Sequence, residues 1–147
     1  MDIARLNILG AGLAIFILSS VIMIFIFRLM NLPKVEYWIG LVLVFSVLPL
    51  GYLLYTAPAL NRPSIFYIQL ILMISFLLIE LFLDYIFRVE FRQTRWMVIT
   101  YVTIFFASTG GMIGIASLAG RGWMIASVSL FLIMTFLAFY QRAKTGM

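Results

Sequence analysis

Cysteine and histidine are both absent from this chain of 147 residues. The lack of cysteine excludes disulfides, thiolate metal sites, iron–sulfur clusters and cysteine nucleophiles. The lack of histidine excludes His-ligated haem and zinc, Ser-His-Asp catalysis and a histidine proton relay near neutral pH. Asp and Glu number only five, too few and too scattered to suggest a carboxylate-bound metal. We therefore expect no metal and no cofactor, and the usual enzyme classes find little support.

Charged residues are also scarce, at 10% of the chain, whereas 65% of the residues are hydrophobic. This leaves too little polar surface to cover a water-soluble globule. We expect an all-α integral membrane protein in a lipid bilayer, with residues 1–147 forming a single transmembrane domain. The net charge of +5 does not indicate nucleic acid as a partner, because the basic residues lie at the ends of apolar runs, where membrane topology explains them.

The apolar runs predict five transmembrane helices. Each run is about twenty residues long, the length that a helix needs to cross roughly 30 Å of hydrocarbon. Tyr37, Trp38, Trp96 and Trp123 open three of them, and such rings favour the headgroup layer. Omitting one span would leave a long apolar segment in water. The expected spans are approximately 6–27, 37–56, 64–87, 96–118 and 123–140, followed by a short polar tail.

The basic residues predict the orientation of the five-helix bundle. With five spans, seven of the ten Lys and Arg fall on the side of the C-terminus and three on the side of the N-terminus. By the positive-inside rule the N-terminus is outside and the C-terminus cytoplasmic. No organelle-targeting segment is visible, so we expect a prokaryotic cytoplasmic membrane. The seven are Arg28, Lys34, Arg88, Arg92, Arg95, Arg142 and Lys144, and the three are Arg5, Arg62 and Arg121.

Small residues and one proline mark expected helix contacts and a kink. Gly10 and Ala14 stand four apart in the first span, as do Gly110 and Gly114 in the fourth, and this spacing favours close helix packing. The alternative at Gly110 is a broken helix with exposed carbonyls, as transporters use. Pro49 lies inside the second span and predicts a kink. A static packing kink is favoured over a moving hinge, because membrane helices tolerate proline without gating.

The most distinctive chemistry lies in the third span, where Glu80, Asp84 and Arg88 follow one another at helical spacing. Asp84 is shallow, and we expect it to pair with Arg88 one turn on. Glu80 lies deeper, roughly 10 Å inside the cytoplasmic end. Tyr85 and Tyr101 are candidate partners for it inside the bundle. A structural polar network is favoured over a functional carboxylate that lines a cavity, although intramembrane acids are often functional.

Three classes of function remain open. The favoured one is a non-enzymatic accessory or structural subunit, which packs against another membrane protein or a second copy of itself. The alternative is a small carrier or sensor bundle that binds an apolar or cationic ligand, or a lipid, with Glu80 as its polar anchor. Last comes a lipid-modifying enzyme with Glu80 and Asp84 as acid and base, since no nucleophile or metal constellation stands beside them.

Overall fold

The computed structural model describes residues 3–86 and 95–145, and every regular element in them is helical. Within these residues, five helical segments are long and apolar enough to cross a membrane, one of them being Pro33–Thr56 with its interruption. The all-α prediction is confirmed for the described residues, and the five segments are those expected of a multi-pass membrane protein. The elements in chain order are α1 (Ile3–Leu29), α2 (Pro33–Phe45), α3 (Val47–Thr56), the 3-10 turn η1 (Pro58–Leu60), α4 (Ser64–Glu80), the π-helix η2 (Leu81–Ile86), α5 (Arg95–Ser117) and α6 (Arg121–Thr145).

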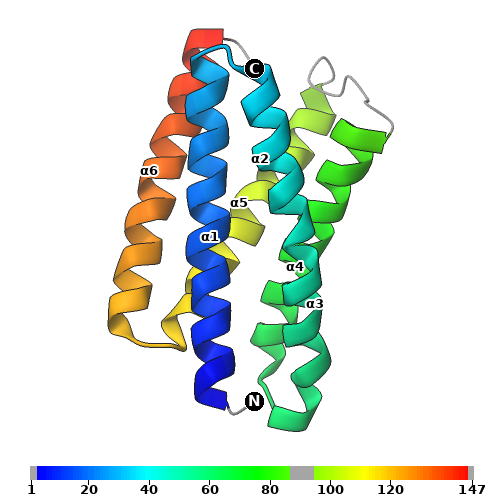
Figure 1. The fold of residues 1–147 in the computed structure, drawn as a ribbon, viewed down its shortest axis with the longest axis vertical. Helices are drawn as coiled ribbons and strands as arrows, with labels where there is room; N and C mark the ends of the chain where they lie inside the picture. The colour runs from blue at the N-terminus through cyan, green and yellow to red at the C-terminus, as the bar shows by residue number, and fades with distance from the viewer. Residues whose placement is uncertain (1–2, 87–94, 146–147) are drawn as a thin grey trace.

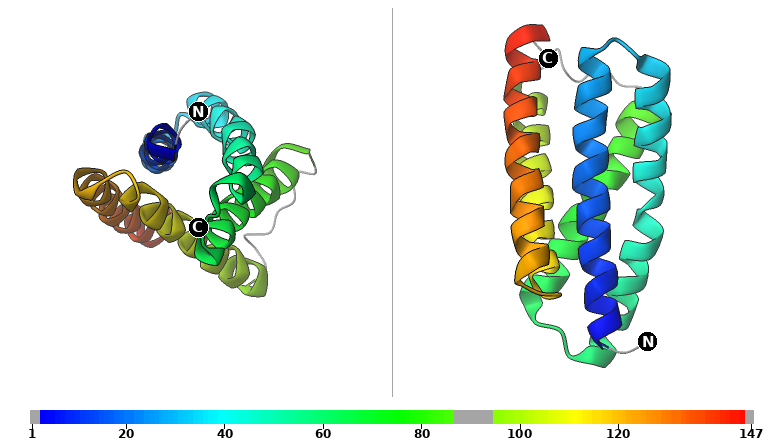
Figure 2. Two further views of the ribbon diagram at one scale, coloured as in Figure 1. Left: turned by 90° about the horizontal axis from the view of Figure 1, so that it is seen from below. Right: turned by 60° about the vertical axis from the view of Figure 1, so that its left-hand side comes forward.

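The helices form one bundle along a common long axis (Figures 1 and 2). The helix α1 begins and α6 ends at opposite ends of the bundle (Figure 1). Successive membrane-crossing segments run antiparallel to one another (Figure 1). The main contacts join α1 to α2, α5 and α6, and α5 to α4 and α6, while α3 packs on α4. The helix α6 lies at the periphery, beside α1 and α5 (Figures 1 and 2).

The bundle is packed tightly along the small-residue face of α1. Gly10 is buried there, and Ala14 has no exposed surface. A Cβ atom added to Gly10 would lie only 2.9 Å from Ile115 Cγ2 of α5. Small residues allow the helix backbones to approach closely. In lipid, the van der Waals packing that results stabilises helix association, because the hydrophobic effect does not act between helices there. Large apolar side chains such as Leu48 and Phe136 are instead 70% and 67% exposed, as expected for a surface that faces lipid.

The second candidate span is interrupted near Pro49. The helix α2 ends at Phe45 and α3 begins at Val47. Proline has no N–H to donate to the carbonyl of Phe45 and its ring crowds that carbonyl, which accounts for the break. The hydroxyl of Ser46, between the two helices, donates to the Leu43 carbonyl at 2.5 Å. Whether the interruption is a static kink or a hinge stays a prediction.

The third span differs from the regular α-helix expected over residues 64–87. The α-helix ends at Glu80, and Leu81–Ile86 is a π-helix. Its i→i+5 hydrogen bonds make a wider turn than an α-helix has. The α-helical spacing assumed for Glu80, Asp84 and Arg88 therefore does not continue past Glu80. The side chain of Asp84 and the whole of Arg88 lie outside the described residues, so their expected ion pair stays a prediction.

Candidate functional site

A cavity of about 470 Å³ lies at the end of the bundle where α1, α4 and α6 end and α2 and α5 begin, at the top of Figure 1. Side chains from all five of these helices line it. Its volume falls within the roughly 300–1,000 Å³ that is typical of small-molecule sites. The cavity therefore has the size and the position, between helices of a bundle, of a ligand site.

Aromatic rings form the inner part of this cavity. We call Phe25, Phe76 and Phe105 the aromatic floor, because each lies about one helical turn further into the bundle than the polar residue on its own helix. The Phe105 ring centroid lies 5.4 Å from that of Phe76 and 6.1 Å from that of Phe25. The rings meet at interplanar angles of 59° and 74°, the tilted and edge-on arrangements that aromatic pairs prefer. The floor thus offers an apolar surface with polarizable ring faces.

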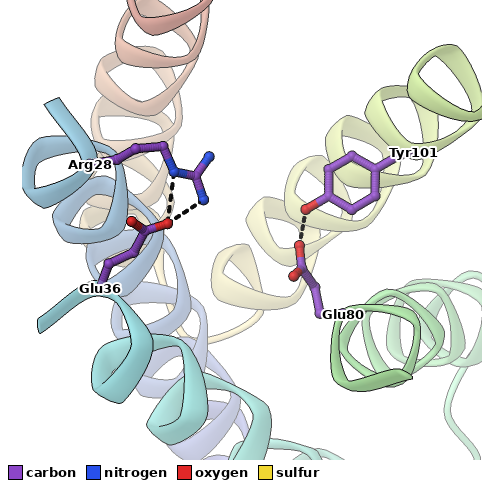
Figure 3. Close-up of polar contacts among 4 residues, drawn as sticks. All are labelled: Arg28, Glu36, Glu80 and Tyr101. Atoms are coloured by element: carbon purple, nitrogen blue, oxygen red, sulfur yellow. Dashed lines mark hydrogen bonds and ion pairs between the residues drawn. The ribbon is translucent and has the colours of Figure 1, made fainter. Parts of the chain in front are cut away.

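Glu80 and Tyr101 form the first polar wall of the cavity. Glu80 is the last residue of α4 and Tyr101 lies in the second turn of α5. Because α4 and α5 pack antiparallel, the two residues reach the same depth, and the Tyr101 hydroxyl donates to Glu80 Oε1 (Figure 3). The Tyr101 ring is held 5.6 Å from that of Phe76. A carboxylate has about four lone-pair sites, so it can accept more than one donor.

Arg28 and Glu36 form the opposite wall. Glu36 Oε1 lies 2.7 Å from Arg28 Nε and 2.5 Å from Nη2, so both donors meet one carboxylate oxygen. Each side chain is 23% exposed. The Arg28 guanidinium also lies 6.0 Å from the centre of the Phe25 ring. Figure 3 shows this pair facing Glu80 and Tyr101 across the space between the helices.

The turn between α1 and α2 brings Arg28 and Glu36 together. Asn31 has a φ of 58°, in the left-handed region that Asn tolerates better than most residues. The Leu32 N–H donates to the Phe27 carbonyl at 3.0 Å and closes the end of α1. Pro33 then starts α2 at a position where no N–H is needed. This reversal within a few residues returns α2 along α1 and sets Glu36 beside Arg28.

Most of the polar lining opposite Glu80 was not predicted from the sequence. Charge counting treats Arg28 and Arg142 only as charges that set orientation, and hydropathy places Gln141 in a tail beyond the last span. In the structure α6 continues to Thr145, so Gln141 and Arg142 are helical and line the cavity. Gln141 is 2% exposed. The available signal was the pair of opposite charges, Arg28 and Glu36, on either side of a short Asn- and Pro-containing link.

The predicted helix-packing residues and Pro49 do not line the cavity. The helix α5 is unbroken through Gly110 and Gly114, so the alternative of a broken helix there is wrong. The two glycines face different neighbours: a Cβ on Gly110 would lie 3.9 Å from Phe131 of α6, whereas one on Gly114 would overlap the Gln69 amide of α4. The side chain of Tyr85 lies outside the described residues. Its expected contact with Glu80 stays a prediction.

The described part of the chain brings together no group of three or more Asp or Glu side chains that could hold a metal ion. Comparison with protein-family models, with curated proteins and with solved structures finds no match for the chain. The chemistry of the cavity is therefore the guide to what the protein does.

Proposed function

We propose that this protein is a small binding bundle, a carrier or a sensor, whose cavity holds an amphipathic molecule with a cationic group at Glu80. The observation that carries the proposal is the position of the Glu80 carboxylate in the wall of a cavity of about 470 Å³ with an aromatic floor. A carboxylate attracts a cation strongly where water is partly excluded. The ring faces of Phe76 and Tyr101 add cation–π attraction, and the floor accepts hydrocarbon.

The accessory-subunit function remains a prediction, because no feature of the described residues favours one protein partner. A lipid-modifying reaction is less well supported. Glu80 accepts a hydrogen bond from a tyrosine hydroxyl, and acid–base chemistry would need a second group beside a reacting atom. Binding of a cationic amphiphile needs only the charge of Glu80, the aromatic rings and the volume of the cavity.

The proposal includes an orientation, with the N-terminus outside a prokaryotic cell and the C-terminus in the cytoplasm. Its support is that most of the described basic residues gather at the end of the bundle that holds the cavity. By the positive-inside rule that end is cytoplasmic. The ligand then enters from the cytoplasm or from the inner leaflet. The residues are Arg28, Lys34, Arg95, Arg142 and Lys144.

Binding of tetraphenylphosphonium, a lipophilic cation, to the full chain in detergent tests this function by isothermal titration calorimetry. We expect saturable binding of one cation per chain. Glu80→Gln should weaken it by at least about tenfold, since two unit charges roughly 5 Å apart at an effective dielectric near 20 interact by about 3 kcal/mol before desolvation. Tyr101→Phe should weaken binding less, because the hydroxyl only orients the carboxylate.

Tyr55→Phe is the matched control for Tyr101→Phe, because Tyr55 lies on α3, outside the cavity, and is 83% exposed. It should leave the affinity unchanged. Equal affinity of the wild type and Glu80→Gln would refute the role of Glu80. Failure of the cation to bind, together with a stoichiometric protein partner in native mass spectrometry of gently purified material, would instead favour the accessory-subunit function.

A further inference from the structure

The cavity carries positive charge on the side opposite Glu80. Arg142 of α6 lines it and is exposed, and Arg28 of α1 lines it next to Glu36. The Arg28 and Glu36 charges compensate each other, so Arg142 leaves this side with a net positive charge. A guanidinium has five N–H donors, and Arg28 directs only its Nε and Nη2 groups at Glu36 Oε1. Both arginines therefore have donors to offer to a ligand.

The two sides together match a ligand with two opposite charges. A cation at Glu80 draws the rest of the molecule into the space between the walls, where Figure 3 shows Arg28 and Glu36 on the far side. An anionic group next to that cation meets guanidinium donors, which suit phosphate and carboxylate oxygens. A simple cation leaves the positive side without a counter-charge. A simple anion would be repelled by Glu80.

We infer, resting on the proposed function, that the ligand is a zwitterionic amphiphile with an ammonium group at Glu80 and a phosphate group at Arg28 and Arg142. Its apolar part lies on the aromatic floor. The cavity is open on the side of Tyr37 of α2 and Val102 of α5, which line it and are 44% and 37% exposed. Acyl chains longer than the cavity can leave through this side, so a bilayer lipid with an ethanolamine-phosphate headgroup is the favoured source.

The test compares three probes on the purified full chain by calorimetry. They are dihexanoyl phosphatidylethanolamine, free phosphoethanolamine and tetraphenylphosphonium. We expect the short-chain lipid to bind and phosphoethanolamine to bind much more weakly, since it lacks the apolar part. Equal binding of the two would assign the ligand to the water-soluble pool and refute the bilayer source.

Arg142→Gln separates the inference from the proposed function. It should weaken binding of the lipid by roughly three- to tenfold, the loss of one charge-assisted contact at a partly exposed site. The same change should strengthen binding of tetraphenylphosphonium slightly, because it removes a repelling positive charge. Arg121→Gln is the matched control, since Arg121 is exposed at the opposite end of the same helix. It should affect neither probe.

The outcomes are distinguishable. If tetraphenylphosphonium binds in a Glu80-dependent way but Arg142→Gln does not weaken lipid binding, the inference of a zwitterionic ligand is wrong and the proposed function stands. If tetraphenylphosphonium binds but the lipid does not bind at all, the inference of a zwitterionic ligand is again wrong and the proposed function again stands. If neither probe binds the wild type, both proposals fail.

Discussion

Gly10→Ala should destabilise the bundle, whereas Gly12→Ala on the same helix should not. A Cβ atom on Gly10 would lie 2.9 Å from Ile115 Cγ2 and 3.6 Å from Leu53 Cδ1. Ile115 is 2% exposed, and its β-branched side chain has one strongly preferred helical rotamer, so it cannot turn away. A Cβ on Gly12 would meet nothing within 4 Å. The two changes add the same methyl group and differ only in what it meets.

The expected difference follows from packing and helix propensity. Both alanines favour the helix over glycine by up to about 1 kcal/mol. Only the Gly10 change overpacks a filled contact, which costs about 1–3 kcal/mol. Gly12→Ala should therefore be neutral or stabilising. The free energy of unfolding of the Gly10→Ala variant should be lower than that of the Gly12→Ala variant by about 1–3 kcal/mol.

Unfolding of the purified chain in mixed micelles with increasing dodecyl sulfate, followed by tryptophan fluorescence, measures this difference. Circular dichroism of both folded variants provides the control for helix content. If Gly10→Ala is as stable as Gly12→Ala, the contact between α1 and α5 is looser than described and the packing argument fails.

Three further predictions concern the kink, the ion pair and the orientation. Pro49→Ala should restore a continuous helix without changing the affinity for tetraphenylphosphonium in calorimetry if the kink is static; a change in affinity would favour a hinge. A double-mutant cycle with Arg28→Gln and Glu36→Gln should give a coupling free energy of about 1–2 kcal/mol in the unfolding assay, which is more than an exposed ion pair gives and less than a buried one. A coupling free energy of zero would show that the two side chains do not form an ion pair. Because the chain has no cysteine, a membrane-impermeant maleimide should label Gly122→Cys but not Ala143→Cys in intact cells, and the reverse pattern would invert the orientation.

Hydropathy and helix length were sufficient to predict the number of spans. Crossing hydrocarbon requires every backbone group to bond within its own segment, so a sufficiently long apolar run has few alternatives to a helix. The same reasoning singles out Glu80, because a carboxylate within such a run is costly. It also predicts Tyr101 as a neighbour, because the two residues lie at similar depth in an antiparallel pair of helices. These inferences depend only on local composition and on position along a helix.

The cavity itself was decided by the tertiary structure. Arg28, Glu36 and Arg142 belong to three different helices, and their approach depends on a left-handed Asn31 and on how far α6 extends. Likewise, only packing shows that Gly114 of α5 faces the Gln69 side chain of α4 and that the helix is unbroken there. Side chains far apart in the sequence meet according to the rotation and tilt of each helix in the bundle. In lipid, close contacts between neighbouring helices set that rotation, whereas hydrophobicity, which the sequence displays most clearly, does not distinguish one apolar face from another.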